Sequence, residues 1–290
     1  MNILITGITG TIGTELARQL LEEGHTLRGL SRDEFKQSKF EYKNHVEMFL
    51  GDIRNINTVE NSMRGIDTVI HTAALKHVDL MEKNINECIY TNVIGTENII
   101  LTQRKLGTRK IVFTSTDKAC YPVNVYGNSK SIGEKLILSN NRNNIVVRYG
   151  NVLNSRGSII GIFKEQLLKH KKIKITHEDM TRFWIKIEDA ARYIIKMTKS
   201  ECHGLAIPEL KAASVVDLAK VIFHNICPGE ALPFEIIGLR PGEKIHECLF
   251  TSKDHLIKNK VYERHNELFS NFSSVQLSYE DLESLVKASL

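Results

Sequence analysis

Cysteine pairs and long apolar runs are missing from this sequence, and each absence excludes a class of protein. The five cysteines form no C-x-x-C pair and show no metal-ligand spacing, which argues against a zinc site and favours reduced thiols. No apolar run approaches the ~20 residues of a membrane span, and the run after Met1 is too short for a signal peptide. We therefore expect no metal, no membrane span and a cytoplasmic location.

A clustered basic face is also missing. The net charge is +5, from 39 basic and 34 acidic residues, and the lysines and arginines are scattered along the chain. A nucleic-acid-binding protein needs such a cluster, so nucleic acid is not an expected partner. The mild basic excess fits an anionic small substrate. With 290 residues and no low-complexity linker, the chain is long enough for one large domain or two closely packed ones.

The N-terminus carries the pattern of a dinucleotide-binding turn. Residues 2–6 (NILIT) predict a strand, TGITGTIG supplies Gly7, Gly10 and Gly13, and an amphipathic helix is predicted over Thr14–Glu23. Glycines let the backbone approach a pyrophosphate, and the positive end of the helix dipole then faces the phosphates. The spacing is G-x-x-G-x-x-G rather than G-x-G-x-x-G, so an ordinary glycine-rich turn is the alternative interpretation.

The next strand favours NADP over NAD. This strand, His25–Leu30, is followed by Arg32 and Lys36, where NAD-binding folds often carry an acid for the ribose hydroxyls. A guanidinium there suits a 2′-phosphate. The alternative is that both cations are merely solvated, because two acids stand between them.

Further strands complete the predicted sheet. Val46–Leu50 leads to Asp52, which would hydrogen-bond the adenine amine or, alternatively, cap a helix over Asn55–Met63. Thr68–His71 ends in the small residues Ala73-Ala74, which allow a cofactor to come close. Strands and helices alternate over 150 residues, which predicts an α/β fold with a Rossmann-like, doubly wound parallel sheet.

The stretch from Ile111 to Lys130 holds the candidate catalytic groups. A short strand is followed by the acid-base pair Asp117-Lys118, and Tyr126 and Lys130 then fall about one turn apart if a helix begins there. The Lys130 ammonium would stabilise the Tyr126 phenolate and lower its pKa, so the phenol could act as a base. Tyr-x-x-x-Lys also occurs by chance, which is the alternative.

After a sixth predicted strand at Asn144–Tyr149, the regular alternation of strands and helices changes. We expect residues 1–150 to form the NADP-binding domain and residues 151–290 mainly a smaller α/β substrate-binding region, with about 186–208 returning to the first domain. Arg182 and Arg240 suit a diphosphate, and Glu243 could hold a ribose.

Several motifs, in order along the chain, resemble one known family. They are TGITGTIG, SRDEFKQ, AALKHVDLMEKNINECIYTNVIGTENII, STDKACYPVNVYGNSK, RYGNVLNSRGSII, MTRFWI and GLRPGEKIHE. Together they resemble the inverting UDP-N-acetylglucosamine 4,6-dehydratases, which are extended short-chain dehydrogenases that begin the synthesis of pseudaminic acid and related bacterial surface sugars. The resemblance covers roughly residues 1 to 255.

The resemblance implies a redox-neutral reaction. Tyr126, assisted by Lys130, would take the proton of the sugar 4-hydroxyl while a hydride passes from carbon 4 to NADP. Lys118 would then remove the carbon 5 proton, and Asp117 would protonate the departing 6-hydroxyl. Hydride returns to carbon 6, and carbon 5 is reprotonated on the opposite face. Thr116 would hydrogen-bond the sugar. A lysine base needs a depressed pKa, which we expect from Lys130, the oxidised nicotinamide and burial.

The resemblance also implies the binding residues and partners. The substrate would be UDP-N-acetylglucosamine or a close UDP-sugar, and the protein is expected to form a homo-oligomer. The cofactor would contact Gly7, Thr9, Gly10, Thr11, Ile12, Gly13, Ser31, Arg32, Lys36, Asp52, Ile53, Ala73, Ala74, Tyr126 and Lys130. The UDP-sugar would contact Lys76, Asn151, Arg156, Thr181, Arg182, Arg240 and Glu243.

Two other functions remain open at this stage. A UDP-sugar epimerase of the same fold also uses the tyrosine and lysine but needs no acid to expel water. A non-catalytic NADP-sensing module would act through protein partners, and it predicts loss of Tyr126 or Lys130, both of which are present.

Overall fold

The larger part of the molecule is a seven-stranded sheet. The computed structural model describes residues 1–140, 142–229, 232–254, 256–257 and 267–287, so residues 258–266 and 288–290 of the predicted second domain lie outside the described residues. The strand order is β10-β6-β5-β4-β1-β2-β3, and neighbouring strands pair in parallel throughout. These strands are β1 (Asn2–Thr6), β2 (Thr26–Ser31), β3 (Val46–Leu50), β4 (Thr68–His71), β5 (Lys110–Thr116), β6 (Ile145–Tyr149) and β10 (Gly204–Ala206).

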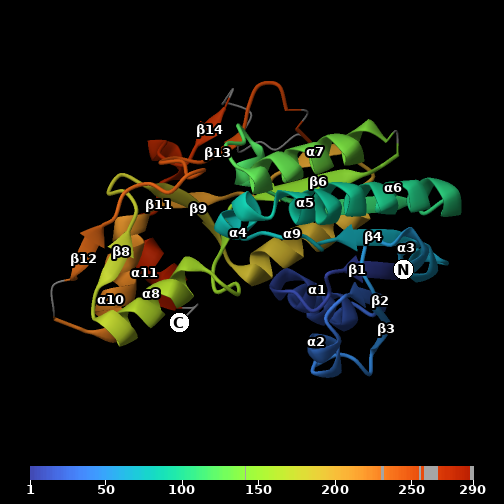
Figure 1. The fold of residues 1–290 in the computed structure, drawn as a ribbon, viewed down its shortest axis with the longest axis horizontal. Coiled ribbons are helices and arrows are strands. Elements are labelled where there is room, and N and C mark those ends of the chain that lie inside the picture. Colours follow the sequence, from blue (N-terminus) through green and yellow to red (C-terminus); the bar gives the residue numbers. More distant parts are fainter. Residues whose placement is uncertain (141, 230–231, 255, 258–266, 288–290) are drawn as a thin grey trace.

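Helices cover both faces of this sheet (Figure 1). On one face lie α1 (Thr11–Glu22) and α9 (Ile187–Lys199), which pack against each other; α3 (Ile56–Met63), α6 (Gly95–Leu106) and α7 (Val125–Ser139) lie on the other. Strands β4, β5, β6 and β10 are buried along their whole length, and β1 is buried from Ile3 onwards, as expected for a sheet covered on both faces. The predicted doubly wound α/β fold is confirmed. Short helices α2 (Glu34–Ser38), α4 (Val78–Lys83) and α5 (Ile85–Ile89) follow β2 and β4.

Some element boundaries differ from those predicted. The first helix begins at Thr11 rather than Thr14. The strand at Ile111 continues through its hydroxyl residues to Thr116, because β6 pairs with it up to that point. The long helix after Asn84 contains a π-helical turn, η1 (Tyr90–Ile94), between α5 and α6.

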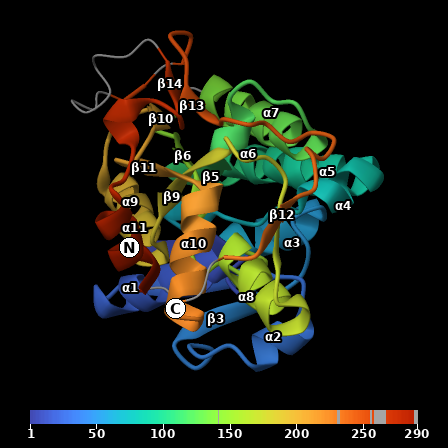
Figure 2. The same cartoon turned by 90° about the vertical axis from the view of Figure 1, so that its left-hand side faces the viewer.

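The smaller part is built from short sheets and helices (Figure 2). Strand β9 (Thr181–Ile185) lies between β11 (Lys211–Ser214) and β7 (Asn151–Val152), and two further pairs join β8 (Ile173–Ile175) to β12 (Phe234–Ile236) and β13 (Cys248–Phe250) to β14 (Leu268–Phe269). The helices are α8 (Ile159–His170), α10 (Val215–Ile226) and α11 (Tyr279–Lys287). They enclose a second apolar core, which includes Phe163, Trp184 and Phe223.

Within the described residues, no helix combines the length and the apolar character needed to cross a bilayer. The chain passes between the two parts more than once, since α9 and β10 follow β9 and rejoin the large sheet. The two parts therefore meet along a wide seam at the carboxyl ends of the parallel strands, where open α/β sheets bind ligands.

Candidate active site

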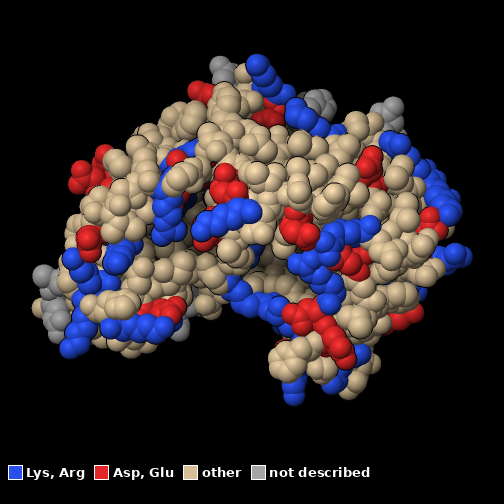
Figure 3. All heavy atoms as spheres, in the orientation of Figure 1, with Lys and Arg blue, Asp and Glu red and all other residues tan. Residues whose placement is uncertain are grey.

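A cavity of about 920 Å³ opens along this seam. Figure 3 shows the surface hollowed between the two parts, with basic and acidic side chains around the rim. Residues of the glycine turn, of the ends of β2, β4, β5 and β6, and of the smaller part all contribute to its wall. The cavity is large enough to hold more than one small-molecule ligand.

The glycine turn forms one end of the cavity. Gly7 has a φ of +70°, and a Cβ there would lie 2.9 Å from the Ala73 backbone. A Cβ on Gly13 would lie 2.5 Å from the Gly7 carbonyl oxygen. Only glycine allows this close packing, which brings the N-terminus of α1 to the cavity wall. The residues present therefore fit a dinucleotide, whose pyrophosphate binds at such a helix end.

The residues predicted to bind the cofactor all lie on the cavity wall. They are Gly7, Thr9, Gly10, Thr11, Ile12, Gly13, Ser31, Arg32, Lys36, Asp52, Ile53, Ala73, Ala74, Tyr126 and Lys130.

At the mouth of this end, acids hold the two candidate phosphate cations. Arg32 Nη1 lies 3.5 Å from Asp52 Oδ2, and Lys36 Nζ lies 2.6 Å from Asp33 Oδ2. Asp52 also accepts from the backbone N–H of Arg54. It does not cap α3, so that alternative is wrong: the Asn55 side chain accepts from the first amides of the helix.

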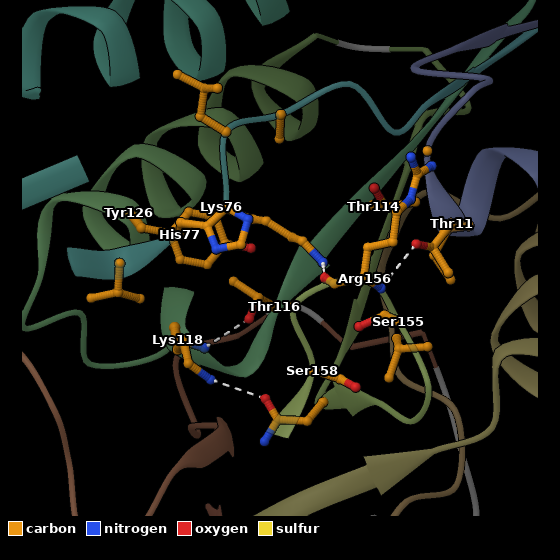
Figure 4. A pocket seen from close by; sticks show the side chains of 18 of the residues that line it. Thr11, Lys76, His77, Thr114, Thr116, Lys118, Tyr126, Ser155, Arg156 and Ser158 are labelled. Carbon is orange, nitrogen blue, oxygen red and sulfur yellow. Dashed lines mark hydrogen bonds between the residues drawn. The ribbon is translucent and has the colours of Figure 1, made fainter. Parts of the chain in front are cut away.

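Helix α7 is docked closely onto the loop that follows β5. Asn124 caps the helix by accepting from the Gly127 N–H at 2.7 Å. A Cβ on Gly127 would lie 2.3 Å from the Lys118 carbonyl oxygen, so only glycine permits the contact. This docking brings Tyr126 and Lys130, one turn apart, to the same cavity as Lys118. Figure 4 shows Tyr126, Thr116 and Lys118 around it.

The π-helical turn η1 helps to hold α7 in place through the side chain of Asn92. Asn92, within the turn, donates to the Ser129 hydroxyl of α7 and to the Leu75 carbonyl, and it accepts from the Leu75 N–H. It thereby links the loop after β4 to α7. Such turns are frequent at functional sites.

The expected electrostatics of Tyr126 and Lys130 are wrong. Burial raises the pKa of Tyr126 to about 12, although the Lys118 charge and a hydrogen bond with Thr116 act against burial. Lys130 lies with its Nζ 3.8 Å from the centre of the Phe113 ring, and burial lowers its pKa to about 7. Lys118 is therefore the charged group that lowers the pKa of the Tyr126 phenol most, whereas the sequence pattern pointed to Lys130.

Lys118 lies between two carboxylates. Its Nζ is 3.1 Å from Asp117 Oδ1 and 3.2 Å from Glu247 Oε1, and it donates to Asn151 Oδ1 at 3.5 Å. Burial disfavours the ammonium, but Asp117 and Glu247 outweigh burial and raise the pKa of Lys118 above its ordinary value. The expected depression of this pKa is therefore wrong, because the acids beside Lys118 outnumber the cation, Arg182, that opposes them.

Asp117 lies behind the cavity wall. Its side chain is fully buried, and its Oδ1 accepts from the Thr116 hydroxyl at 3.1 Å and from Lys118. Burial raises the pKa of this carboxyl, although the Lys118 charge opposes the rise. Thr116 and Lys118 line the cavity, so Asp117 reaches it through them.

Cations line the cavity between the glycine turn and the smaller part of the molecule. Lys76 Nζ donates to the Arg156 carbonyl oxygen at 2.9 Å, and burial lowers the pKa of Lys76, with the Arg156 charge adding to the effect. The Arg156 guanidinium donates to the Thr9 carbonyl oxygen and thus connects the two parts of the molecule. Of the predicted substrate residues, Lys76, Asn151, Arg156, Arg182, Arg240 and Glu243 line the cavity.

Thr181 is the predicted substrate residue that the structure does not place on the cavity wall. Its hydroxyl is hydrogen-bonded to Ser270 at 2.7 Å and to His246 Nδ1 at 2.9 Å. The neighbouring Arg182 donates to the carbonyls of Lys244 and Ile245 and so fixes the segment before β13.

Glu247 is a site residue that the sequence reasoning missed. It is 2 % exposed and lines the cavity, and its Oε2 lies 3.0 Å from Lys244 Nζ. Burial alone would raise its pKa, but Lys118, Arg182 and Lys244 together lower it to about 2. The signal that could have found it is its place at the end of GLRPGEKIHE.

Comparisons with known proteins agree with this geometry. The family model described as "Polysaccharide biosynthesis protein" matches residues 3–268. The chain belongs to this family. A UDP-N-acetylglucosamine 4,6-dehydratase (inverting) from Campylobacter jejuni subsp. jejuni serotype O:23/36 is 40% identical over 270 residues, which cover 87% of this chain and 78% of that protein.

Two further proteins are similar to this chain over most of its length. A UDP-glucose 4-epimerase from Rickettsia canadensis is 35% identical over 268 residues, covering 87% of this chain and 78% of the epimerase. The X-ray structure of Pen from Bacillus thuringiensis superposes with a TM-score of 0.88 at 33% identity, covering 99% of this chain and 97% of Pen.

Proposed function

We propose that this chain is an NADP-dependent UDP-N-acetylglucosamine 4,6-dehydratase that inverts carbon 5. The product would be UDP-2-acetamido-2,6-dideoxy-β-L-arabino-hex-4-ulose. The observation that carries the proposal is Lys118 at the cavity wall, beside Asp117 and in the same cavity as Tyr126 and Lys130. Retaining sugar-nucleotide dehydratases carry an Asp-Glu pair where this chain has Asp117-Lys118, so the lysine favours inversion.

The chain's own groups divide the proton transfers among them. Tyr126 takes the proton of the sugar 4-hydroxyl; the Lys118 charge and the Thr116 hydroxyl lower its pKa against burial. When bound, NADP⁺ accepts hydride from carbon 4, later returns it to carbon 6, and brings a positive charge to the site. Lys118, as its free amine, removes the carbon 5 proton, which the neighbouring ketone acidifies.

Asp117 supplies the proton that converts the 6-hydroxyl into water. Because burial raises its pKa, this carboxyl holds a proton more readily than an exposed aspartate does. The proton would pass through the Thr116 hydroxyl, which contacts both the carboxyl and the cavity.

Cations of the cavity wall would bind the UDP diphosphate. Lys76, Arg156 and Arg240 line the cavity, and guanidinium groups bind phosphate oxygens in pairs. Glu243, whose carboxylate accepts from the Arg240 N–H at 3.0 Å, would hold a ribose hydroxyl.

Arg32 and Lys36 support NADP as the cofactor. Both line the dinucleotide end of the cavity at the position of an adenosine ribose, where a 2′-phosphate would meet two cations.

The test is incubation with UDP-N-acetylglucosamine and NADP⁺, followed by mass spectrometry and proton NMR of the sugar. The proposal expects loss of one water, a new methyl signal, a 4-keto group and inverted configuration at carbon 5. Retained water with altered stereochemistry at carbon 4 would instead identify an epimerase. The 35% identity to a UDP-glucose 4-epimerase makes that second function worth the same experiment with UDP-glucose.

A further inference from the structure

Glu247 lines the cavity beside Lys118, the proposed base for carbon 5. We propose that Glu247 is a positioning residue that, with Asp117, holds the Lys118 amine at the cavity wall and stabilises the ammonium formed when Lys118 takes the carbon 5 proton. This inference rests on the proposed function and adds to it a residue far along the chain.

The contacts of Lys118 come from separate elements. Asp117 lies beside it at the end of β5, Asn151 lies on β7, and Glu247 immediately precedes β13. The Lys118 side chain has little freedom to move, because its Nζ contacts the carboxylates of Asp117 and Glu247 at 3.1 and 3.2 Å. Of these two acids, only Glu247 lies on the cavity wall.

Glu247 is itself fixed from several sides. Its backbone N–H donates to the Ser270 hydroxyl at 2.9 Å, and its carbonyl accepts from the Ser270 N–H. Its second carboxylate oxygen lies 3.0 Å from Lys244 Nζ, and Lys244 donates to the Cys120 carbonyl on the loop after β5. These contacts place one carboxylate oxygen of Glu247 towards Lys244 and the other towards Lys118.

The transfer of the carbon 5 proton to Lys118 explains why a second carboxylate would favour the reaction. The C5–H bond breaks, its electron pair passes into the enolate of the 4-ketone, and the proton moves to the Lys118 nitrogen. The amine thereby becomes an ammonium in a buried site, where an adjacent fixed carboxylate stabilises the new charge. The charged and titratable groups that face Lys118 are Asp117, Glu247, Arg182 and Tyr126.

The first test is the pH profile of Glu247→Gln, which keeps the shape of the side chain and removes its charge. Loss of one facing carboxylate weakens the hold on the Lys118 proton. The rising limb of kcat against pH should therefore shift to lower pH by about one unit or more. The plateau should fall about ten- to a hundredfold, because the amine is less well placed. KM for the UDP-sugar should change far less than kcat.

Two further variants are the controls. Glu247→Asp keeps the charge and should return the rising limb towards the wild-type position. Glu165→Gln removes an exposed carboxylate of α8 that pairs with Lys169 and should leave the profile unchanged. An unshifted limb in Glu247→Gln, or an equal shift in Glu165→Gln, would overturn the inference.

A second measurement needs neither turnover nor a folded variant. Competitive acetylation of the wild-type protein with acetic anhydride, read by mass spectrometry across pH, gives the pKa of Lys118. This pKa should lie above the ordinary lysine value of 10.5, and a value at or below 10.5 would contradict the carboxylate clamp. If the wild type makes no dehydrated product while Lys118 still titrates high, the proposed function fails and the clamp stands.

Discussion

Lys130 and Lys118 line the same cavity, but the pKa values of their side chains are shifted in opposite directions. Lys130 lies against the Phe113 ring, is 3 % exposed, and has its pKa lowered to about 7. Lys118 is also shielded from water, but it contacts two carboxylates and its pKa moves in the opposite direction. Burial acts on both ammonium groups alike, so the difference comes from the acids.

This difference suggests that the two lysines have separate roles in the reaction. Lys130, on the cofactor side, has a pKa near 7 and so changes its charge easily near neutral pH. Lys118, on the sugar side, holds its proton more tightly, so its free amine forms only once the positive charge of the bound nicotinamide lowers its pKa. The following experiments test whether the two lysines act separately.

The largest effect is expected for Lys118→Ala. Dehydration should fall by about ten-thousandfold, because the base for carbon 5 is lost. Oxidation at carbon 4 keeps its base, Tyr126, although it should slow without the Lys118 charge beside the phenol. The absorbance of reduced nicotinamide should therefore rise slowly on mixing with substrate and then persist. Lys105→Ala, which removes an exposed lysine paired with Glu60, is the control. Undiminished turnover in Lys118→Ala would end the division of roles.

Tyr126→Phe should act one step earlier. Without the phenol oxygen, the carbon 4 oxidation should slow by about a hundredfold or more, and no reduced nicotinamide should accumulate. Stopped-flow absorbance of both variants separates the steps. A build-up of reduced nicotinamide in Tyr126→Phe would show that another group takes the 4-hydroxyl proton.

The sequence anticipated much of the cofactor side and less of the sugar side. The bounds of β3 and β4 and the shared face of Tyr126 and Lys130 follow from local patterns, so they could be read from the chain. The pKa directions of the two lysines could not, because they depend on burial and on Glu247, which tertiary packing brings to Lys118.

The same reason explains two smaller differences. Thr181 stands in a motif that suggested substrate contact, but packing against Ser270 turns its hydroxyl away from the cavity. Asn55 rather than Asp52 caps α3, because its side chain reaches the first free amides of the helix while Asp52 pairs with Arg54 and Arg32.

Arg32→Ala tests the cofactor side alone. The affinity for NADP should weaken by about ten- to a hundredfold, because a charge-assisted contact to the 2′-phosphate is lost. The affinity for NAD should change less than about twofold. Isothermal titration calorimetry with both dinucleotides measures this ratio, and equal losses for the two would remove the case for NADP.

The last prediction concerns stability rather than activity, and it involves Lys130. The folded chain gives up the Lys130 proton near pH 7, whereas the unfolded chain keeps it to about 10.5. Between these values the unfolded state binds more protons, so this lysine makes stability rise by up to about 1.4 kcal/mol per pH unit. Below pH 7 its penalty is constant.

Lys130→Met removes that penalty. Its free energy of unfolding relative to the wild type should be most favourable at or below pH 7 and should decline as pH rises above it. Urea unfolding of both proteins over this pH range measures the difference. A difference that is independent of pH would mean that Lys130 stays charged in the folded protein.

The central claim is that the Lys118 amine removes the carbon 5 proton and that carbon 5 is reprotonated on the other face. The most direct measurement is the reaction with UDP-N-acetylglucosamine in deuterium oxide, with proton and deuterium NMR of the product. The account predicts deuterium at carbon 5 in the inverted configuration, and its loss in Lys118→Ala. A product that keeps protium or the original configuration at carbon 5 would contradict it.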